Sequence, residues 1–214
     1  MTRAEARRTA VIDLGSNTFR LVVFTAVPGA WWRRTDEIYE PVRIGAGMVE
    51  GGPLKPKRVR RALDTVEMYA GFLRATGIEA GDVRAVATSA IREASDRDEF
   101  VARAREATGL DVRVLSREEE ARYGYLAAVN SSTLDHGAVL DLGGGSLQLV
   151  RVDHRVAQES GSWRLGTVRM TEAFLESGGE EPATKKQLKA LRAHAREALA
   201  DAPWLATSGE RLVG

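Results

Sequence analysis

The sequence contains no cysteine, which excludes disulfide bonds, thiolate metal sites and cysteine nucleophiles. It has no apolar run near the roughly 18 residues of a membrane helix, and its first residues lack the apolar stretch of a secretory signal. Neither sign of charge dominates, because 31 Lys and Arg face 30 Asp and Glu. We therefore expect a cytoplasmic protein without a membrane anchor or specific nucleic-acid binding, which holds any anionic ligand at a local site.

The 214 residues, 43% of them apolar, can build a sizeable core and favour two modest domains. Short β-branched runs alternate with segments of helical periodicity, which is typical of α/β proteins. We expect strands at residues 10–14, 19–27, 82–87 and 111–115, and helices at 57–76 and 95–108. Ser95 is the expected cap of the second of these helices, and Gly77 and Gly109 are expected just past the two ends.

One stretch of sequence occurs twice. Residues 10–24 read AVIDLGSNTFRLVVF and residues 138–152 read AVLDLGGGSLQLVRV, so Asp13 corresponds to Asp141, 128 positions later. In each copy two apolar runs flank a short turn, which predicts a strand–turn–strand hairpin. Arg20 and Gln148 hold equivalent places in the two copies but differ in chemistry.

The two turns have the composition of phosphate-binding loops. Small residues let backbone N–H groups approach an anion closely, and an Asp before such a turn can ligate Mg²⁺ together with phosphate oxygens. A single such turn is often only a matter of backbone geometry, but its repetition favours a function. The expected phosphate-binding residues are Gly15, Ser16, Asn17, Thr18, Gly143, Gly144, Gly145 and Ser146, and the expected Mg²⁺ ligands are Asp13 and Asp141.

Two further segments carry candidate groups. Ser89 and Arg92 follow the strand at 82–87, where open α/β sheets usually bind ligands, so Arg92 can hold a phosphate or simply pair with a surface carboxylate. Ser116 and Glu119 form a capping-box pattern, so acidic residues here are explained by the start of a helix. Only Glu120 has no role in that cap.

Five segments in order resemble the exopolyphosphatase and guanosine pentaphosphate phosphohydrolase family of the actin, Hsp70 and sugar kinase superfamily. They read AVIDLGSNTFRLVVF, ATSAIREA, SREEEARYGYLA, AVLDLGGGSLQLV and LGTVRMTEAFL. The resemblance implies two ribonuclease H-like domains with mixed sheets flanked by helices, at 1–125 and 126–214. The second is expected to be incomplete, because relatives continue beyond a strand like that at 211–214.

The resemblance also implies roles for residues. Glu120 matches the catalytic glutamate, Ser89 and Arg92 match a phosphate-gripping loop, and Asp141 matches the Mg²⁺ side of an inter-domain cleft. The implied activity is release of terminal phosphate from inorganic polyphosphate or guanosine pentaphosphate. Gln148 stands where the family usually has Glu, so we expect this metal ligand to be weakened.

That departure leaves a second function open, a non-catalytic module that binds polyphosphate or guanosine pentaphosphate. A kinase of the same superfamily is a third and less favoured interpretation. The chain could also pair with a second copy of itself.

Overall fold

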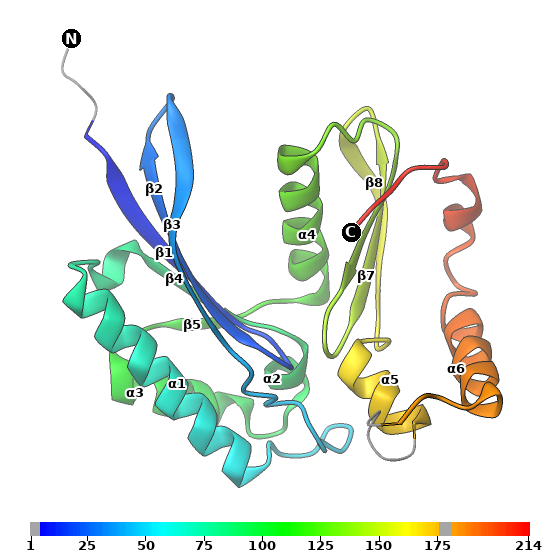
Figure 1. Ribbon diagram of the computed structural model, residues 1–214, viewed down its shortest axis with the longest axis horizontal. Helices are drawn as coiled ribbons and strands as arrows, with labels where there is room; N and C mark the ends of the chain where they lie inside the picture. Colours follow the sequence, from blue (N-terminus) through cyan, green and yellow to red (C-terminus); the bar gives the residue numbers. More distant parts are fainter. Residues whose placement is uncertain (1–4, 176–180) are drawn as a thin grey trace. The chain divides into compact units, whose positions relative to one another are not determined.

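The structure is a computed structural model that describes residues 5–175 and 181–214. The chain divides into two compact units, Met1–Leu115 and Ser116–Gly214 (Figure 1). The helix that begins at Arg117 packs on the second sheet and belongs to the second unit. Among the residues that the structure describes, no helix is both long and apolar enough to span a bilayer.

The first unit is built on a mixed sheet with the strand order β3-β2-β1-β4-β5. The hairpin predicted from the sequence is present, since β1 and β2 pair antiparallel and place Asp13 opposite Arg20. β4 and β5 then add in parallel on the other side of β1. The strands are β1 (Arg7–Leu14), β2 (Phe19–Val27), β3 (Trp31–Glu40), β4 (Val83–Ala87) and β5 (Val112–Val114).

Helices α1 (Pro56–Ala75), α2 (Ser89–Glu93) and α3 (Arg97–Thr108) complete this unit, and its core forms where α1 and α3 pack against the sheet. Figure 1 shows α1 and α3 on the same face of that sheet. Tyr69 of α1 is fully buried there, and its hydroxyl donates to the carbonyl oxygen of Phe19. Burial, helped by nearby carboxylates, raises the pKa of the Tyr69 hydroxyl above its ordinary value, so this donor keeps its proton.

The second unit repeats the first in shorter form. Its sheet has the order β8-β7-β6-β9, in which β6 and β7 form the antiparallel hairpin and β9 pairs parallel with β6. β9 thus holds the place that β4 holds in the first unit. The strands are β6 (Gly137–Leu142), β7 (Leu147–Asp153), β8 (Val156–Trp163) and β9 (Leu212–Val213).

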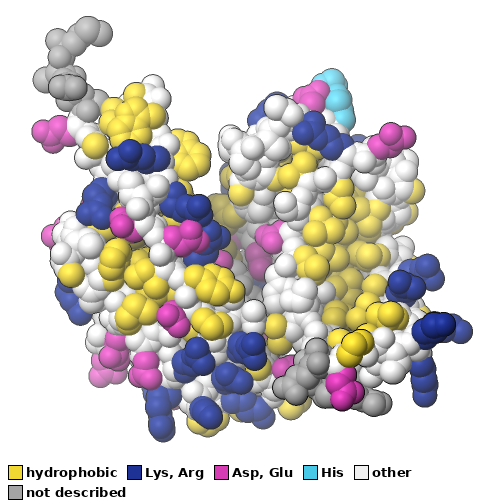
Figure 2. Space-filling view, viewed as in Figure 1, with side chains coloured by type: hydrophobic (Ala, Val, Ile, Leu, Met, Phe, Trp, Pro, Cys, Tyr) yellow, Lys and Arg dark blue, Asp and Glu magenta, His cyan; other side chains and the backbone are white. Residues whose placement is uncertain are grey.

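Helices cover both faces of the second sheet. Helix α4 (Arg117–Ser131) packs on alternate residues such as Val139 and Val150, while α5 (Thr167–Phe174) and α6 (Lys185–Ala198) lie toward the other face with Leu147 and Leu149. This alternation follows from the two-residue period of a strand. Figure 2 shows hydrophobic side chains gathered between β7 and α6, and α6 itself has no buried residue.

The predicted cap of α3 is wrong by one residue. Asp96, not Ser95, is the N-cap of α3, because tertiary bonds fix this segment: Ser95 N donates to the carbonyl of Gly52, and Asp96 Oδ1 accepts from Leu54 N. Helix α5 begins at Thr167, and Gly166 is its N-cap. The capping box at Ser116 and Glu119 and the left-handed Gly109 are confirmed.

Candidate phosphate and metal site

The two hairpin turns, residues 15–18 and 143–146, are closed by the same hydrogen bond. Gly15 N donates to Thr18 O over 3.1 Å, and Gly143 N donates to Ser146 O over 3.0 Å. We call them the first turn and the second turn. A Cβ on Gly15 would lie 2.9 Å from Thr18 O, so the first turn requires a glycine there.

In the first unit the turn is tied to the start of α2. Ser16 and Ser89 lie 73 residues apart in sequence, yet their hydroxyls are 2.7 Å from each other and both side chains are buried. Ser16 Oγ also accepts from the backbone N of Ala90 over 3.0 Å. These two hydroxyls therefore fix the backbone of both loops, and the phosphate contacts predicted for the two serines stay a prediction.

Arg92 lies on α2, a short helix within the loop predicted to grip phosphate. Its Nη1 donates to the carbonyl of Leu115 over 3.0 Å, and its Nε and Nη2 atoms are buried. Part of the guanidinium is thus held against backbone, and the phosphate contact predicted for Arg92 stays a prediction. Asp13, by contrast, stands exposed at the end of β1, opposite Arg20, which pairs with Glu37 of β3.

In the second unit the N-terminus of α5 binds the carbonyls of the second turn. Thr167 N donates to Gly143 O and Val168 N to Gly144 O, both over 2.9 Å, while Arg169 Nε donates to Gly145 O over 3.1 Å. In a trans peptide the C=O and the following N–H point in opposite directions. The N–H groups of residues 144–146 therefore face away from α5, as a nest for an anion requires.

Gly166 makes this arrangement possible. A Cβ on Gly166 would lie 2.3 Å from both N and C of Gly145, so α5 approaches the turn as closely as backbone allows. Sequence reasoning missed Gly166, although the LGT tripeptide before a helical segment was a signal of a glycine at a helix start.

Glu120 lies at the second turn. It lies near the N-terminus of α4 and is partly buried. Its Oε1 accepts a 3.3 Å hydrogen bond from Ser146 Oγ. The capping box leaves this side chain out, because it uses Glu119. The structure therefore brings together Glu120 and Ser146, two residues that the sequence placed 26 positions apart.

Asp141 lies next to the same helix face, one turn further along. A Cβ on Gly124 would be 3.1 Å from Asp141 Oδ2, so the carboxylate occupies the space that this glycine leaves open. Although Asp141 stays accessible to solvent, surrounding protein raises the pKa of its carboxyl above the ordinary value by desolvation. Gly124 was also missed, and a glycine inside a helix was the available signal.

Gln148 is the cross-strand neighbour of Asp141, as Arg20 is of Asp13. Its side chain is 2% exposed, and its Nε2 donates to Ser146 Oγ over 2.9 Å and to Ser162 Oγ over 3.2 Å. Gln148, Ser146 and Glu120 thus form one hydrogen-bonded chain, in which the amide and the carboxylate hold the hydroxyl between them. Its predicted role as a metal ligand stays a prediction.

The second unit therefore offers backbone donors for an anion, one carboxylate at Asp141 and a second at Glu120. The first unit offers an equivalent turn and a partly buried arginine. These are the parts from which phosphate-handling α/β proteins are built, and the repeated mixed sheet defines the actin-like class of that fold.

The chain belongs to the Ppx/GppA phosphatase family, whose model matches residues 27–213. It is 31% identical over 192 residues to a guanosine-5'-triphosphate,3'-diphosphate pyrophosphatase of Aliivibrio fischeri, an alignment that covers 89% of this chain and 37% of that protein. An uncharacterized Streptomyces coelicolor protein is 34% identical over 204 residues, which cover 91% of this chain and 57% of the other.

Solved structures agree with the fold. A crystal structure of an exopolyphosphatase from Cytophaga hutchinsonii has a TM-score of 0.85 at 22% identity, covering 96% of this chain and 65% of that one. The structure of the Aquifex aeolicus Ppx/GppA enzyme has a TM-score of 0.72 at 30% identity, and the match covers 92% of this chain and 64% of that one. The chain thus spans less than two thirds of each of these relatives, and the prediction of two mixed sheets flanked by helices is confirmed.

Proposed function

We propose that the chain is a phosphohydrolase that removes the terminal phosphate from inorganic polyphosphate or guanosine pentaphosphate. The single observation that carries this proposal is the contact between Glu120 Oε1 and Ser146 Oγ. It places a carboxylate, otherwise unexplained by its helix, beside a turn whose amides face away from α5.

The chemistry follows from what these groups can do. Amides of residues 144–146 bind the oxygens of the terminal phosphoryl group, and Glu120 accepts a proton from a water molecule aligned with the terminal phosphorus. The water oxygen forms a bond to phosphorus, the bond from phosphorus to the bridging oxygen breaks, and the shortened chain leaves. Phosphoryl transfer depends mainly on positioning the reactants and stabilising charge. A general base and a set of fixed hydrogen-bond donors are the groups that supply these two effects.

The residues of the second unit fit a Mg²⁺ ion. Asp141 offers a carboxylate that is accessible to solvent, and desolvation by the surrounding protein raises its pKa above the ordinary value. A cation bound by Asp141 would offset the charge of this carboxylate and would supply neutralisation of the negative charge on the phosphate oxygens. Asp141 is the residue of the second unit that would hold it, since Mg²⁺ prefers carboxylate oxygens.

The substrate class rests on the relatives. One carries the name of a guanosine pentaphosphate pyrophosphatase and another that of an exopolyphosphatase, and both names describe release of phosphate from a phosphoanhydride. The test measures orthophosphate released from each substrate, with Mg²⁺ and with excess chelator. Mg²⁺-dependent release from either substrate supports the proposal, and no release from both would overturn it.

Gln148 favours a second candidate, a module that binds the phosphate chain without cleaving it. A neutral amide next to Asp141 removes one negative charge from the metal side of the site. The same assay separates the two functions if binding is followed in parallel, because the module would bind polyphosphate and release no phosphate.

Changing Gln148 to Glu is expected to make the protein depend more strongly on Mg²⁺. The new carboxylate would be buried beside Ser146 and one hydrogen bond away from Glu120, so in chelator we expect stability to fall by roughly 1–3 kcal/mol. Adding Mg²⁺ should restore the stability of the variant. The Mg²⁺ concentration that gives half-maximal activity should be lower for the variant than for wild type. Thermal unfolding with and without Mg²⁺ measures this, and an equal Mg²⁺ response in the two proteins would contradict it.

A further inference from the structure

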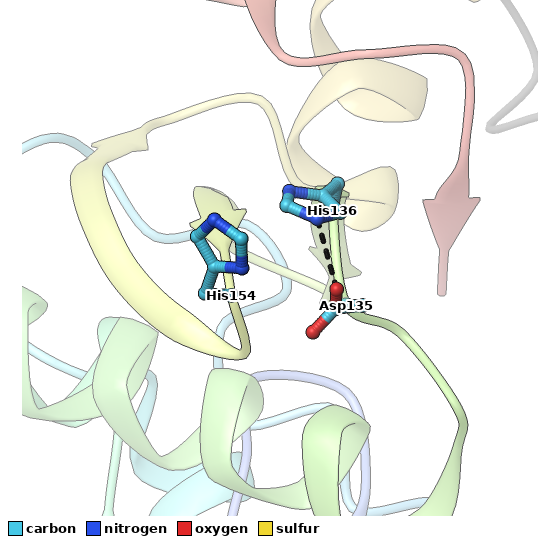
Figure 3. A group of neighbouring side chains, drawn as sticks. All are labelled: Asp135, His136 and His154. Atoms are coloured by element: carbon cyan, nitrogen blue, oxygen red, sulfur yellow. Dashed lines mark ion pairs between the residues drawn. The ribbon is translucent and has the colours of Figure 1, made fainter.

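A cluster of histidines and carboxylates lies at the other end of the second sheet from the second turn. Asp135 and His136 precede β6, and His154 lies in the β7–β8 turn. Figure 3 shows the three side chains facing a common space. Each of them offers one ligand atom, and these atoms all lie within 4.8 Å of one another. All three residues are exposed, so the cluster is accessible to ions from solution.

We propose that Asp135, His136 and His154 bind a divalent transition-metal ion of the Zn²⁺ type. Two imidazoles and a carboxylate suit zinc and its neighbours, whereas Mg²⁺ prefers oxygen ligands alone. The site goes beyond the proposed hydrolase activity and uses none of the residues assigned to it.

A fourth residue orients His136. Asp153 Oδ1 lies 2.6 Å from His136 Nδ1, while Asp135 Oδ2 lies 2.8 Å from His136 Nε2. A neutral imidazole that donates its Nδ1–H to Asp153 leaves the Nε2 lone pair directed at the cluster. Metal-ligating histidines usually donate their second N–H to a carboxylate in this way, which fixes the tautomer and strengthens the ligand. Asp153 is therefore a positioning residue for the site.

The backbone of the β7–β8 turn also holds His154 toward His136. His154 and Arg155 both have positive φ, 48° and 61°, in a two-residue hairpin turn that usually contains Asn-Gly. Arg155 is anchored by its guanidinium, which donates to the carbonyls of Ser132 and Leu134. The turn thus fixes His154, whose ring centroid lies 4.5 Å from that of His136.

The distances accommodate such an ion with a small adjustment. Tetrahedral ligands about 2.0–2.1 Å from zinc lie roughly 3.3 Å from one another. The 2.8 Å between His136 and Asp135 would open by about half an ångström, and the wider separations in the cluster would close. The side chains of His136 and Asp135 are 53% and 54% exposed, so their rotamers are not locked by packing.

The test is equilibrium dialysis of the 214-residue chain against Zn²⁺ at neutral pH, with Mg²⁺ in large excess to keep Zn²⁺ from oxygen sites. We expect one Zn²⁺ per chain. His136→Ala and His154→Ala should each weaken Zn²⁺ binding at least about tenfold. Asp153→Asn should weaken it about tenfold, because His136 loses the carboxylate that orients its ring. His194→Ala is the matched control, because it removes the third histidine of the chain and lies on α6.

Co²⁺ gives a second readout. We expect the visible absorption of tetrahedral Co²⁺ with wild type and with His194→Ala, and its loss with His154→Ala. If wild type binds no Zn²⁺ in excess Mg²⁺, the cluster consists only of the contacts of His136 with two carboxylates, and the proposal is wrong. Equal Zn²⁺ affinity in wild type and His154→Ala would also overturn it, whatever the outcome of the phosphate assay.

Discussion

Replacing Glu120 with glutamine is expected to lower the rate of phosphate release by about 10²–10⁴-fold, the usual contribution of a positioned general base. Glutamine keeps the shape of the side chain and an oxygen that can accept from Ser146 Oγ, but it cannot take a proton from water. Polyphosphate binding should therefore stay within about twofold of wild type. Steady-state phosphate release and a separate binding titration measure the two effects.

Glu118→Gln provides the matched control, because it makes the same chemical change two residues earlier on α4. Glu118 is exposed, and its Oε2 accepts a hydrogen bond from the hydroxyl of Ser116. We expect its activity to remain near that of wild type. If Glu120→Gln and Glu118→Gln release phosphate equally fast, the role given to Glu120 is wrong.

Replacing Asp141 with asparagine is expected to reduce phosphate release at saturating substrate by at least about 10²-fold, because the site loses its Mg²⁺ ligand. The same change should not destabilise the metal-free protein. Desolvation raises the pKa of the Asp141 carboxyl above its unfolded value, so ionisation lowers stability as pH rises through the interval between the two pKa values. Above that interval the cost is complete, and asparagine removes it.

Melting temperatures in chelator and activities across a Mg²⁺ titration test this second prediction. The control is Asp98→Asn, a highly exposed aspartate on α3 in the first unit, which should change neither. If the Asp141→Asn variant keeps the Mg²⁺ dependence of wild type, the assignment of Asp141 as the Mg²⁺ ligand is wrong.

Local patterns predicted much of the fold. The equivalence of the two hairpins, and of Arg20 with Gln148, is confirmed by the register, because a short turn fixes which residues pair across two strands. The capping box at Ser116 was also predictable, because its two residues are only three positions apart in sequence. The strand at 211–214 is confirmed as β9, which completes the parallel pair with β6.

Tertiary contacts were beyond the reach of such patterns. The bond between Ser16 and Ser89, the packing of Gly166 on Gly145 and the bond from Leu54 to Asp96 join residues far apart in sequence. Gln148 shows the same limit, because its sequence position indicated a metal ligand but its burial added a hydrogen bond to Ser146. The histidine cluster also depends on the hairpin that brings residue 154 back to residue 136.

The most direct test of the hydrolase proposal is phosphorus NMR of polyphosphate incubated with the chain and Mg²⁺. Removal of terminal phosphate produces orthophosphate while the number of chain ends stays constant until the chains become short. We predict that result for wild type, and its absence for Glu120→Gln under the same conditions. Intact polyphosphate with wild type, or a growing number of chain ends from internal cleavage, would contradict it.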